Sequence, residues 1–144
     1  MEQTAQPPIR ALVVDDSTTL RRLMELILVP LGLQLDFVDT GERALELAKR
    51  NTYDIVFLDI LLPGIDGYRV CKEIKADKRT KDVPIVMLTS RTSAIDKVRG
   101  MMAGSDVYLT KPVDRVDLLR AIEKCLPQMR SALKPLRPAP AAGH

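Results

Sequence analysis

Four short apolar runs in this chain each end in a polar residue, and this pattern constrains the fold more than any other feature of the sequence. The polar residues at their ends are Asp15 and Asp16, Asp59, Thr89, and Lys111. Runs rich in Val, Ile and Leu are typical of strands buried on both faces of a parallel sheet. In such sheets ligands bind just beyond the carboxyl ends of the strands. The sequence therefore predicts three carboxylates, a hydroxyl and an ammonium around one crevice, which would suit a divalent cation and a phosphoryl group.

The alternation of strand-like and helix-like segments predicts the topology. Apolar runs predict strands over residues 9–15, 33–38, 55–59, 83–89 and 106–110. Apolar residues recur at helical spacing in stretches that begin near residues 17, 41, 67, 93 and 114. The fourth of these stretches is expected to turn Ile95, Val98 and Met102 inward. Right-handed crossovers put helices on both faces, so we expect a doubly wound, flavodoxin-like α/β fold, (βα)5, with five parallel strands in the common order 2-1-3-4-5.

Composition divides the chain into three parts. We expect a flexible N-terminal lead over residues 1–8, one domain over residues 9–126 and a Pro/Ala-rich basic tail or linker over residues 127–144. A chain of 144 residues suits one domain with a real core. No apolar run comes near the roughly 20 residues that a membrane span needs, and the N-terminus lacks the pattern of a signal peptide. A cytoplasmic protein without membrane contact is therefore expected.

The net charge of +3 comes from the tail alone. Residues 127–144 contain Arg130, Lys134 and Arg137 and no acid, so the rest of the chain carries 19 basic and 19 acidic residues. With no Trp and 3% aromatic residues, this balance makes direct nucleic-acid binding unexpected. Cys71 and Cys125 lie in helical stretches without metal-ligand spacing, so they are expected to be reduced thiols.

The acids at the ends of the first and third strands predict a magnesium site. If these strands are neighbours, Asp15, Asp16 and Asp59 converge, and two like charges 4 Å apart cost about 4 kcal/mol at an effective dielectric constant of 20. A cation would offset that cost, and Mg²⁺ prefers carboxylate oxygens and keeps positions open for phosphate. A carboxylate can also be phosphorylated, and Asp59 is the candidate. Thr89 and Lys111 could then stabilise the phosphoryl oxygens.

These residues carry a family resemblance. The segments Val14–Ser17, Phe57–Gly67, Leu88–Ser90 and Tyr108–Pro112 resemble the motifs of the receiver domain of bacterial two-component response regulators. The resemblance runs from about residue 9 to residue 126, and it looks like the single-domain, chemotaxis or twitching-motility type. It implies that Asp59 accepts a phosphoryl group from a histidine kinase or phosphotransfer protein. Small-molecule phosphodonors such as acetyl phosphate are a further possible source.

The resemblance also implies roles for individual residues. Asp16, Asp59 and the backbone carbonyl of Leu61 would bind Mg²⁺ directly, and Asp15 would act largely through water. Lys111 and Thr89 would hold the phosphoryl oxygens, and the peptide bond between Lys111 and Pro112 would be cis. Such a protein is a signalling receiver rather than a metabolic enzyme. It catalyses its own phosphoryl transfer, and the residues two positions after Asp59 and Thr89, Leu61 and Arg91, indicate slow self-dephosphorylation.

Tyr108 resembles the switch residue of the family, which turns inward when Thr89 moves towards the phosphoryl group. An ordinary half-buried strand tyrosine is the open alternative. The switch would change the face made by the fourth helix, the fifth strand and the fifth helix, where a downstream target protein would bind. Met101, Met102 and Val113 could supply apolar contacts on that face, although ordinary packing is the alternative for each of them.

The sequence has three other interpretations. A haloacid-dehalogenase-type phosphatase needs two acids separated by one residue, whereas Asp15 and Asp16 are adjacent. A flavin carrier needs a phosphate-binding loop after the first strand, where these acids would repel phosphate. A receiver that signals by binding alone remains the stronger rival, and phosphorylation of Asp59 would separate it from a phosphorylated switch.

Overall fold

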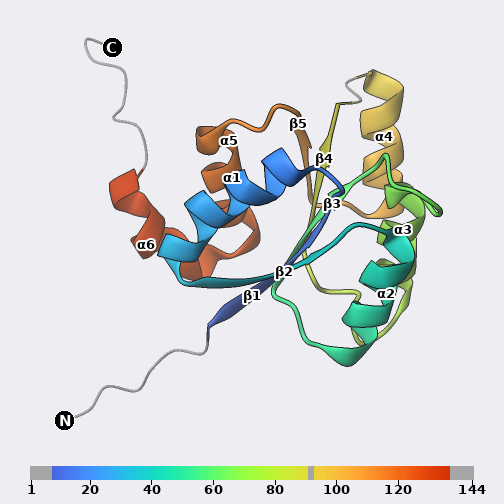
Figure 1. Cartoon of the computed structure of the whole chain (residues 1–144), viewed down its shortest axis with the longest axis horizontal. Helices are drawn as coiled ribbons and strands as arrows, with labels where there is room; N and C mark the ends of the chain where they lie inside the picture. The colour runs from blue at the N-terminus through green and yellow to red at the C-terminus, as the bar shows by residue number, and fades with distance from the viewer. Residues whose placement is uncertain (1–7, 91–92, 137–144) are drawn as a thin grey trace.

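The computed structural model describes residues 8–90 and 93–136, which form a parallel five-stranded sheet between two layers of helices (Figure 1). The strands are β1 (Ile9–Val14), β2 (Leu33–Val38), β3 (Ile55–Asp59), β4 (Ile85–Thr89) and β5 (Val107–Thr110). Their order across the sheet is β2-β1-β3-β4-β5. The predicted doubly wound, flavodoxin-like fold and its strand order are therefore confirmed.

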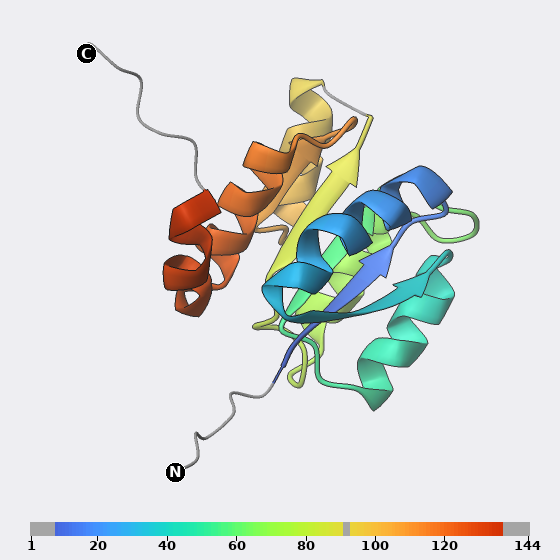
Figure 2. The ribbon, with the colours of Figure 1, turned by 60° about the vertical axis from the view of Figure 1, so that its left-hand side comes forward.

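Helices cover both faces of the sheet, as Figures 1 and 2 show. The α-helices are α1 (Thr18–Leu28), α2 (Gly41–Arg50), α3 (Gly67–Ala76), α4 (Ala94–Ala103), α5 (Arg115–Cys125) and α6 (Arg130–Leu133), and the 3-10 turns are η1 (Val29–Leu31), η2 (Pro127–Met129) and η3 (Lys134–Leu136). Helices α1, α5 and α6 lie on one side, and α2, α3 and α4 lie on the other. Within the described residues, no helix combines the length and the apolar character that crossing a membrane would require.

The core consists of two apolar layers separated by the sheet. Along β1, Ala11 and Val13 face α1 and α5, whereas Leu12 and Val14 face α2 and α3. This division follows from the two-residue period of a strand, and it explains why β1 and β3 read as continuous apolar runs. Because apolar side chains fill both faces of the sheet, polar functional groups are expected at its two ends.

The prediction that Ile95, Val98 and Met102 of α4 face the core is wrong. Ile95, Val98 and Met102 are 74%, 52% and 79% exposed, and the helix turns Gly100 and Ala103 towards the sheet instead. The physical reason lies in β5, because a Cβ atom on Gly100 would lie 3.0 Å from Cδ2 of Tyr108. Small residues let the helix pack closely over that ring. Its larger apolar side chains are left on the outside.

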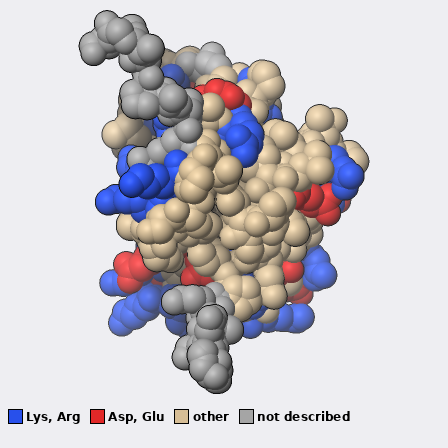
Figure 3. All heavy atoms as spheres, turned by 90° about the vertical axis from the view of Figure 1, so that its left-hand side faces the viewer, with Lys and Arg blue, Asp and Glu red and all other residues tan. Residues whose placement is uncertain are grey.

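The domain also extends beyond the predicted boundary at residue 126. Residues 127–136 form helical turns, in which Met129 and Leu133 are buried in the α1–α5 core and Leu136 packs against it. Pro127 does not end the structure because proline is tolerated in the first turn of a helix. Figure 3 views this side of the molecule and shows a broad uncharged surface with Lys and Arg towards its edges. Residues 1–7 of the flexible lead predicted over residues 1–8, and the last eight residues, 137–144, lie outside the described residues.

Candidate metal and phosphoryl site

The carboxyl ends of β1 and β3 bring the three predicted acids together. The two strands are hydrogen-bonded neighbours, with Val14 opposite Leu58, so the residues that follow them share one edge of the sheet. One carboxylate oxygen from each of Asp15, Asp16 and Asp59 lies within 4.8 Å of the others. Asp15 is fully buried and Asp59 is 4% exposed, whereas Asp16 faces solvent.

Lys111 reaches the same cluster from the end of β5. Its Nζ atom lies 2.6 Å from Oδ2 of Asp15 and 3.0 Å from Oδ2 of Asp59. The Lys111 backbone N–H donates to the carbonyl oxygen of Thr89 at 2.8 Å, which fixes the start of the loop. The peptide bond between Lys111 and Pro112 is cis, as the resemblance implied.

Each of the two buried acids uses one oxygen to hold the backbone and turns the other towards the crevice. Oδ1 of Asp15 accepts from the Ser17 N–H at 2.7 Å, and Oδ1 of Asp59 accepts from the Leu61 N–H at 3.1 Å. Oδ2 of Asp15 is buried and has no hydrogen bond of good geometry, although the Lys111 ammonium is close. A bound cation is one physical explanation for a buried carboxylate oxygen that has no hydrogen bond.

The charges in the crevice perturb one another. Burial raises the pKa of Asp59, and the neighbouring Asp15 charge raises it further, while the hydrogen bond from Lys111 opposes both. Burial pulls the pKa of Lys111 down, but its close ion pairs with the Asp15 and Asp59 carboxylates outweigh burial and raise it. A single ammonium therefore does not fully offset the crowded acids.

The donor set fits Mg²⁺. The possible ligands that converge here are carboxylate oxygens, and three carboxylates with one oxygen each within 4.8 Å of the others can lie around one small cation. The backbone at Leu61 lies next to them, since its N–H is bonded to Asp59. Hard oxygen ligands without His or Cys favour magnesium over zinc or copper.

Thr89 and Tyr108 share one face of the sheet near the acids. Thr89 is fully buried at the end of β4, which lies between β3 and β5. In the register of β4 and β5, Met87 pairs with Tyr108 and Thr89 with Thr110, so Thr89 and Tyr108 project to the same side. That side is the one covered by α3 and α4.

Two side chains that the sequence did not single out support the loops of the site. Arg21 on α1 donates from Nε to the backbone carbonyl of Asp15 at 3.1 Å. Glu42 on α2 accepts from the Ile65 N–H at 3.3 Å, in the loop that follows Leu61. Nothing in the residue pattern marks these two, because each contact joins separate elements.

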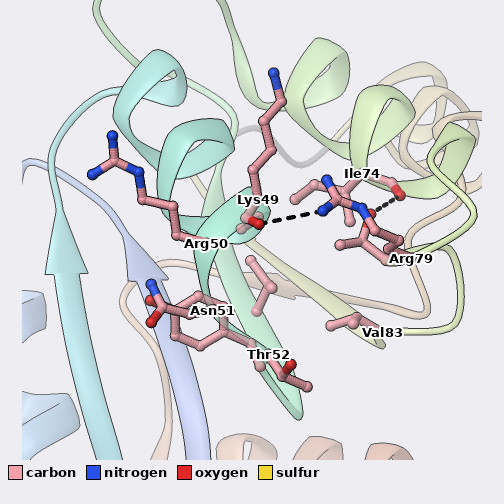
Figure 4. A pocket seen from close by; sticks show the side chains of 11 residues that line it. Lys49, Arg50, Asn51, Thr52, Ile74, Arg79 and Val83 are labelled. Carbon is pink, nitrogen blue, oxygen red and sulfur yellow. Dashed lines mark hydrogen bonds between the residues drawn. The ribbon is translucent and has the colours of Figure 1, made fainter.

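A cavity of about 130 Å³ lies at the opposite end of the sheet, between the ends of α2 and α3 (Figure 4). The Arg79 guanidinium crosses it and donates to the Lys49 carbonyl at 3.5 Å, and it also pairs with Asp77. None of the acids of the crevice lines this cavity. This cavity is therefore separate from the acidic crevice.

Fold and site together define a flavodoxin-like protein with an acidic crevice at the carboxyl edge of a parallel sheet. A family model described as the response regulator receiver domain matches residues 11–123. The chain belongs to this family, and it is thus a receiver domain of two-component signalling, as the motifs predicted. The match favours this interpretation over both the phosphatase and the flavin carrier.

Individual relatives support the same family assignment. Protein PilG of Pseudomonas aeruginosa is 38% identical over 127 residues, which span 88% of this chain and 93% of PilG. The structure of chemotaxis protein CheY4 of Vibrio cholerae has a TM-score of 0.78 at 28% identity and covers 83% of this chain and 100% of that one. The receiver domain of sensor histidine kinase PA1611 of P. aeruginosa, solved with a magnesium ion in its active site cleft, has a TM-score of 0.75 at 32% identity, over 82% and 97% of the two chains. Several longer curated relatives are matched over half of their length or less.

Proposed function

We propose that this protein is a signalling switch in which Asp59 accepts a phosphoryl group from a histidine kinase or phosphotransfer protein. The observation that supports this most is the environment of Asp59. Its Oδ1 is held by the Leu61 N–H, and its Oδ2 faces the Lys111 ammonium at 3.0 Å. One carboxylate oxygen is thus held in place while the other is directed into a crevice that can stabilise negative charge.

In the transfer step, Oδ2 of Asp59 attacks the phosphorus atom of a phosphohistidine. The new P–O bond forms as the P–N bond breaks, and the imidazole nitrogen keeps the electron pair. Lys111 lies beside Oδ2 of Asp59 and would donate to one oxygen of a phosphoryl group there, and Thr89 would donate to another. Asp15, Asp16, Asp59 and the Leu61 carbonyl would hold Mg²⁺, which when bound neutralises charge on the transferring group. The magnesium seen in the PA1611 receiver supports this assignment.

The lifetime of the phosphoryl group should be unexceptional. Leu61, two residues after Asp59, is 47% exposed and carries no group that could position a water molecule. Arg91, the second position expected to affect lifetime, lies outside the described residues. We expect slow self-dephosphorylation, and radiolabelled phosphoprotein that decays within seconds in magnesium buffer would contradict this.

The output surface should be the face made by α4, β5 and α5. Four of the seven large hydrophobic side chains that are exposed in the described residues belong to α4; they are Ile95, Val98, Met101 and Met102. Such a concentration is typical of a protein-binding surface. Val113 instead packs partly against the α1–α5 core. A downstream target protein is therefore the expected partner, without direct nucleic-acid contact, and the cytoplasm remains the expected location.

Phosphorylation by acetyl phosphate and Mg²⁺, measured by intact mass, tests the proposal. Wild-type protein should gain one phosphoryl group, and Asp59→Asn should gain none. Asp39→Asn is the matched control, because Asp39 also follows a strand, β2, but is not among the clustered acids. A phosphoryl group gained by Asp59→Asn, or none gained by the wild type, would contradict the proposal and favour a module that signals by binding alone.

A further inference from the structure

Tyr68 connects α3 to the first turn of α4. The Tyr68 side chain is 5% exposed, and its hydroxyl donates to the backbone carbonyl of Asp96 at 3.1 Å, with Oδ1 of Asp96 at 3.4 Å. The guanidinium carbon of Arg99 lies 4.2 Å from the centre of the Tyr68 ring. Residues 96 and 99 are one turn apart on α4, so the helix contacts both the hydroxyl and the ring of Tyr68.

Tyr68 also shares an apolar cluster with Tyr108, which packs against that cluster from β5. Burial and the nearby Asp96 charge raise the pKa of Tyr68, while a hydrogen bond from Tyr108 lowers it. A tyrosine hydroxyl has one donor proton and can also accept. Tyr68 can therefore donate to Asp96 and accept from Tyr108 at the same time, which places one oxygen between α4 and β5.

The surroundings leave little freedom at this junction. Asp96 is held on its other side by Ser93, whose hydroxyl donates to Oδ2 at 2.6 Å and accepts from the Asp96 N–H at 3.1 Å. The ring of Tyr108 lies against the backbone of α4 at Gly100, where a Cβ atom would meet Cδ2 at 3.0 Å. A movement of Tyr108 thus changes either its hydrogen bond to Tyr68 or its packing on α4.

We propose that Tyr68 is a positioning residue that couples Tyr108 to the first turn of α4, so that a displacement of Tyr108 is transmitted to α4 through a side chain of α3. The part played by Tyr108 as the switch rests on the proposed function, but the coupling itself is a property of the unphosphorylated protein. Tyr68 does not act on the phosphoryl group. Its effect is on the exposed apolar face of α4.

Fluorine NMR of protein labelled with 3-fluorotyrosine tests the coupling, because the chain has three tyrosines and each resonance can be assigned by substitution. Tyr68→Phe removes the hydroxyl and keeps the ring. Tyr53→Phe is the matched control, since Tyr53 is also 5% exposed and its hydroxyl donates to Asp36 at 2.6 Å, away from α4. We expect the Tyr108 resonance to shift in Tyr68→Phe and to stay in place in Tyr53→Phe.

Hydrogen–deuterium exchange gives the second measurement. Loss of one hydrogen bond from the first turn should speed exchange in residues 94–103 about five-fold in Tyr68→Phe. It should leave them unchanged in Tyr53→Phe. An unshifted Tyr108 resonance, or equal exchange of α4 in the two variants, would overturn the proposal, because Tyr53→Phe loses an equally buried hydroxyl that has no contact with α4.

Phosphorylation separates this proposal from the function proposed above. Tyr68→Phe should gain its phosphoryl group as fast as the wild type, but α4 should respond less to it. A wild type that is never phosphorylated refutes the switch and leaves the coupling measurements intact. If Tyr68→Phe does not fold, Gly100→Ala replaces it, since the added methyl group displaces Tyr108. Coupling then predicts that the Tyr68 resonance moves as well, and a stationary Tyr68 resonance overturns it.

Discussion

Leu133→Ala tests whether residues 127–136 belong to the domain. Leu133 is 1% exposed and packs with Met129 against the α1–α5 core. The substitution removes roughly three buried carbon groups, worth about 2.4 kcal/mol at about 0.8 kcal/mol each. A residual cavity adds to that loss, although the short α6 can settle partly into the space. We therefore expect the free energy of unfolding to fall by about 2–3 kcal/mol.

Urea denaturation followed by far-ultraviolet circular dichroism measures this change. Thermal unfolding should show a midpoint lower by about 10 °C, since 1 kcal/mol corresponds to about 4 °C in a domain of this size. Leu26→Ala is the matched control, because Leu26 is a helical leucine that is 59% exposed, and it should change stability by no more than about 0.5 kcal/mol. If Leu133→Ala is no less stable than Leu26→Ala, residues 127–136 are a loose tail and the packing argument fails.

Three further predictions concern the crevice and the proposed output face. Lys111→Met should bind Mg²⁺ more tightly in calorimetry, since a competing cation is lost, yet accept phosphate about 100-fold more slowly from acetyl phosphate; unchanged transfer would exclude Lys111 from the site. Because the pKa of Asp59 is raised by burial and by the Asp15 charge, protons compete for its oxygen, and Mg²⁺ affinity should begin to fall at a higher pH than it would for an ordinary Asp with a pKa of about 3.9; an affinity independent of pH would argue against Asp59 as a ligand. Ile95→Ser should leave phosphorylation intact and change stability by no more than about 0.5 kcal/mol, because this side chain is 74% exposed; a large loss of stability would show that α4 is covered within the domain.

The sheet and the acidic crevice were predictable because they depend on rules that act along single segments. An apolar run of strand length predicts a buried strand, and in a parallel sheet the residue after it lies at the carboxyl edge. Asp15 follows β1 and Asp59 ends β3, so their convergence needed only the strand order. Their hydrogen bonds to Ser17 and Leu61 are equally local, since each spans two residues.

The errors arose where packing between elements decided the outcome. Helical spacing correctly indicated an apolar face on α4, but whether that face is covered depends on how Gly100 fits against Tyr108. The same spacing continues past Pro127 to Leu133, where the proline and the basic residues favour a tail in the sequence but packing against α1 and α5 makes the segment helical. The contact between Tyr68 and Asp96 joins residues 28 positions apart and follows from the approach of α3 to α4, which no single segment encodes.

Location of the phosphoryl group is the most direct test of the central claim. Borohydride reduces an aspartyl phosphate to homoserine, so protein treated with acetyl phosphate and Mg²⁺ can be reduced, digested and mapped by mass spectrometry. The account predicts homoserine at position 59 and aspartate at positions 15 and 16. Homoserine at Asp15 or Asp16 in place of Asp59, or at none of the three after verified phosphorylation, would contradict it.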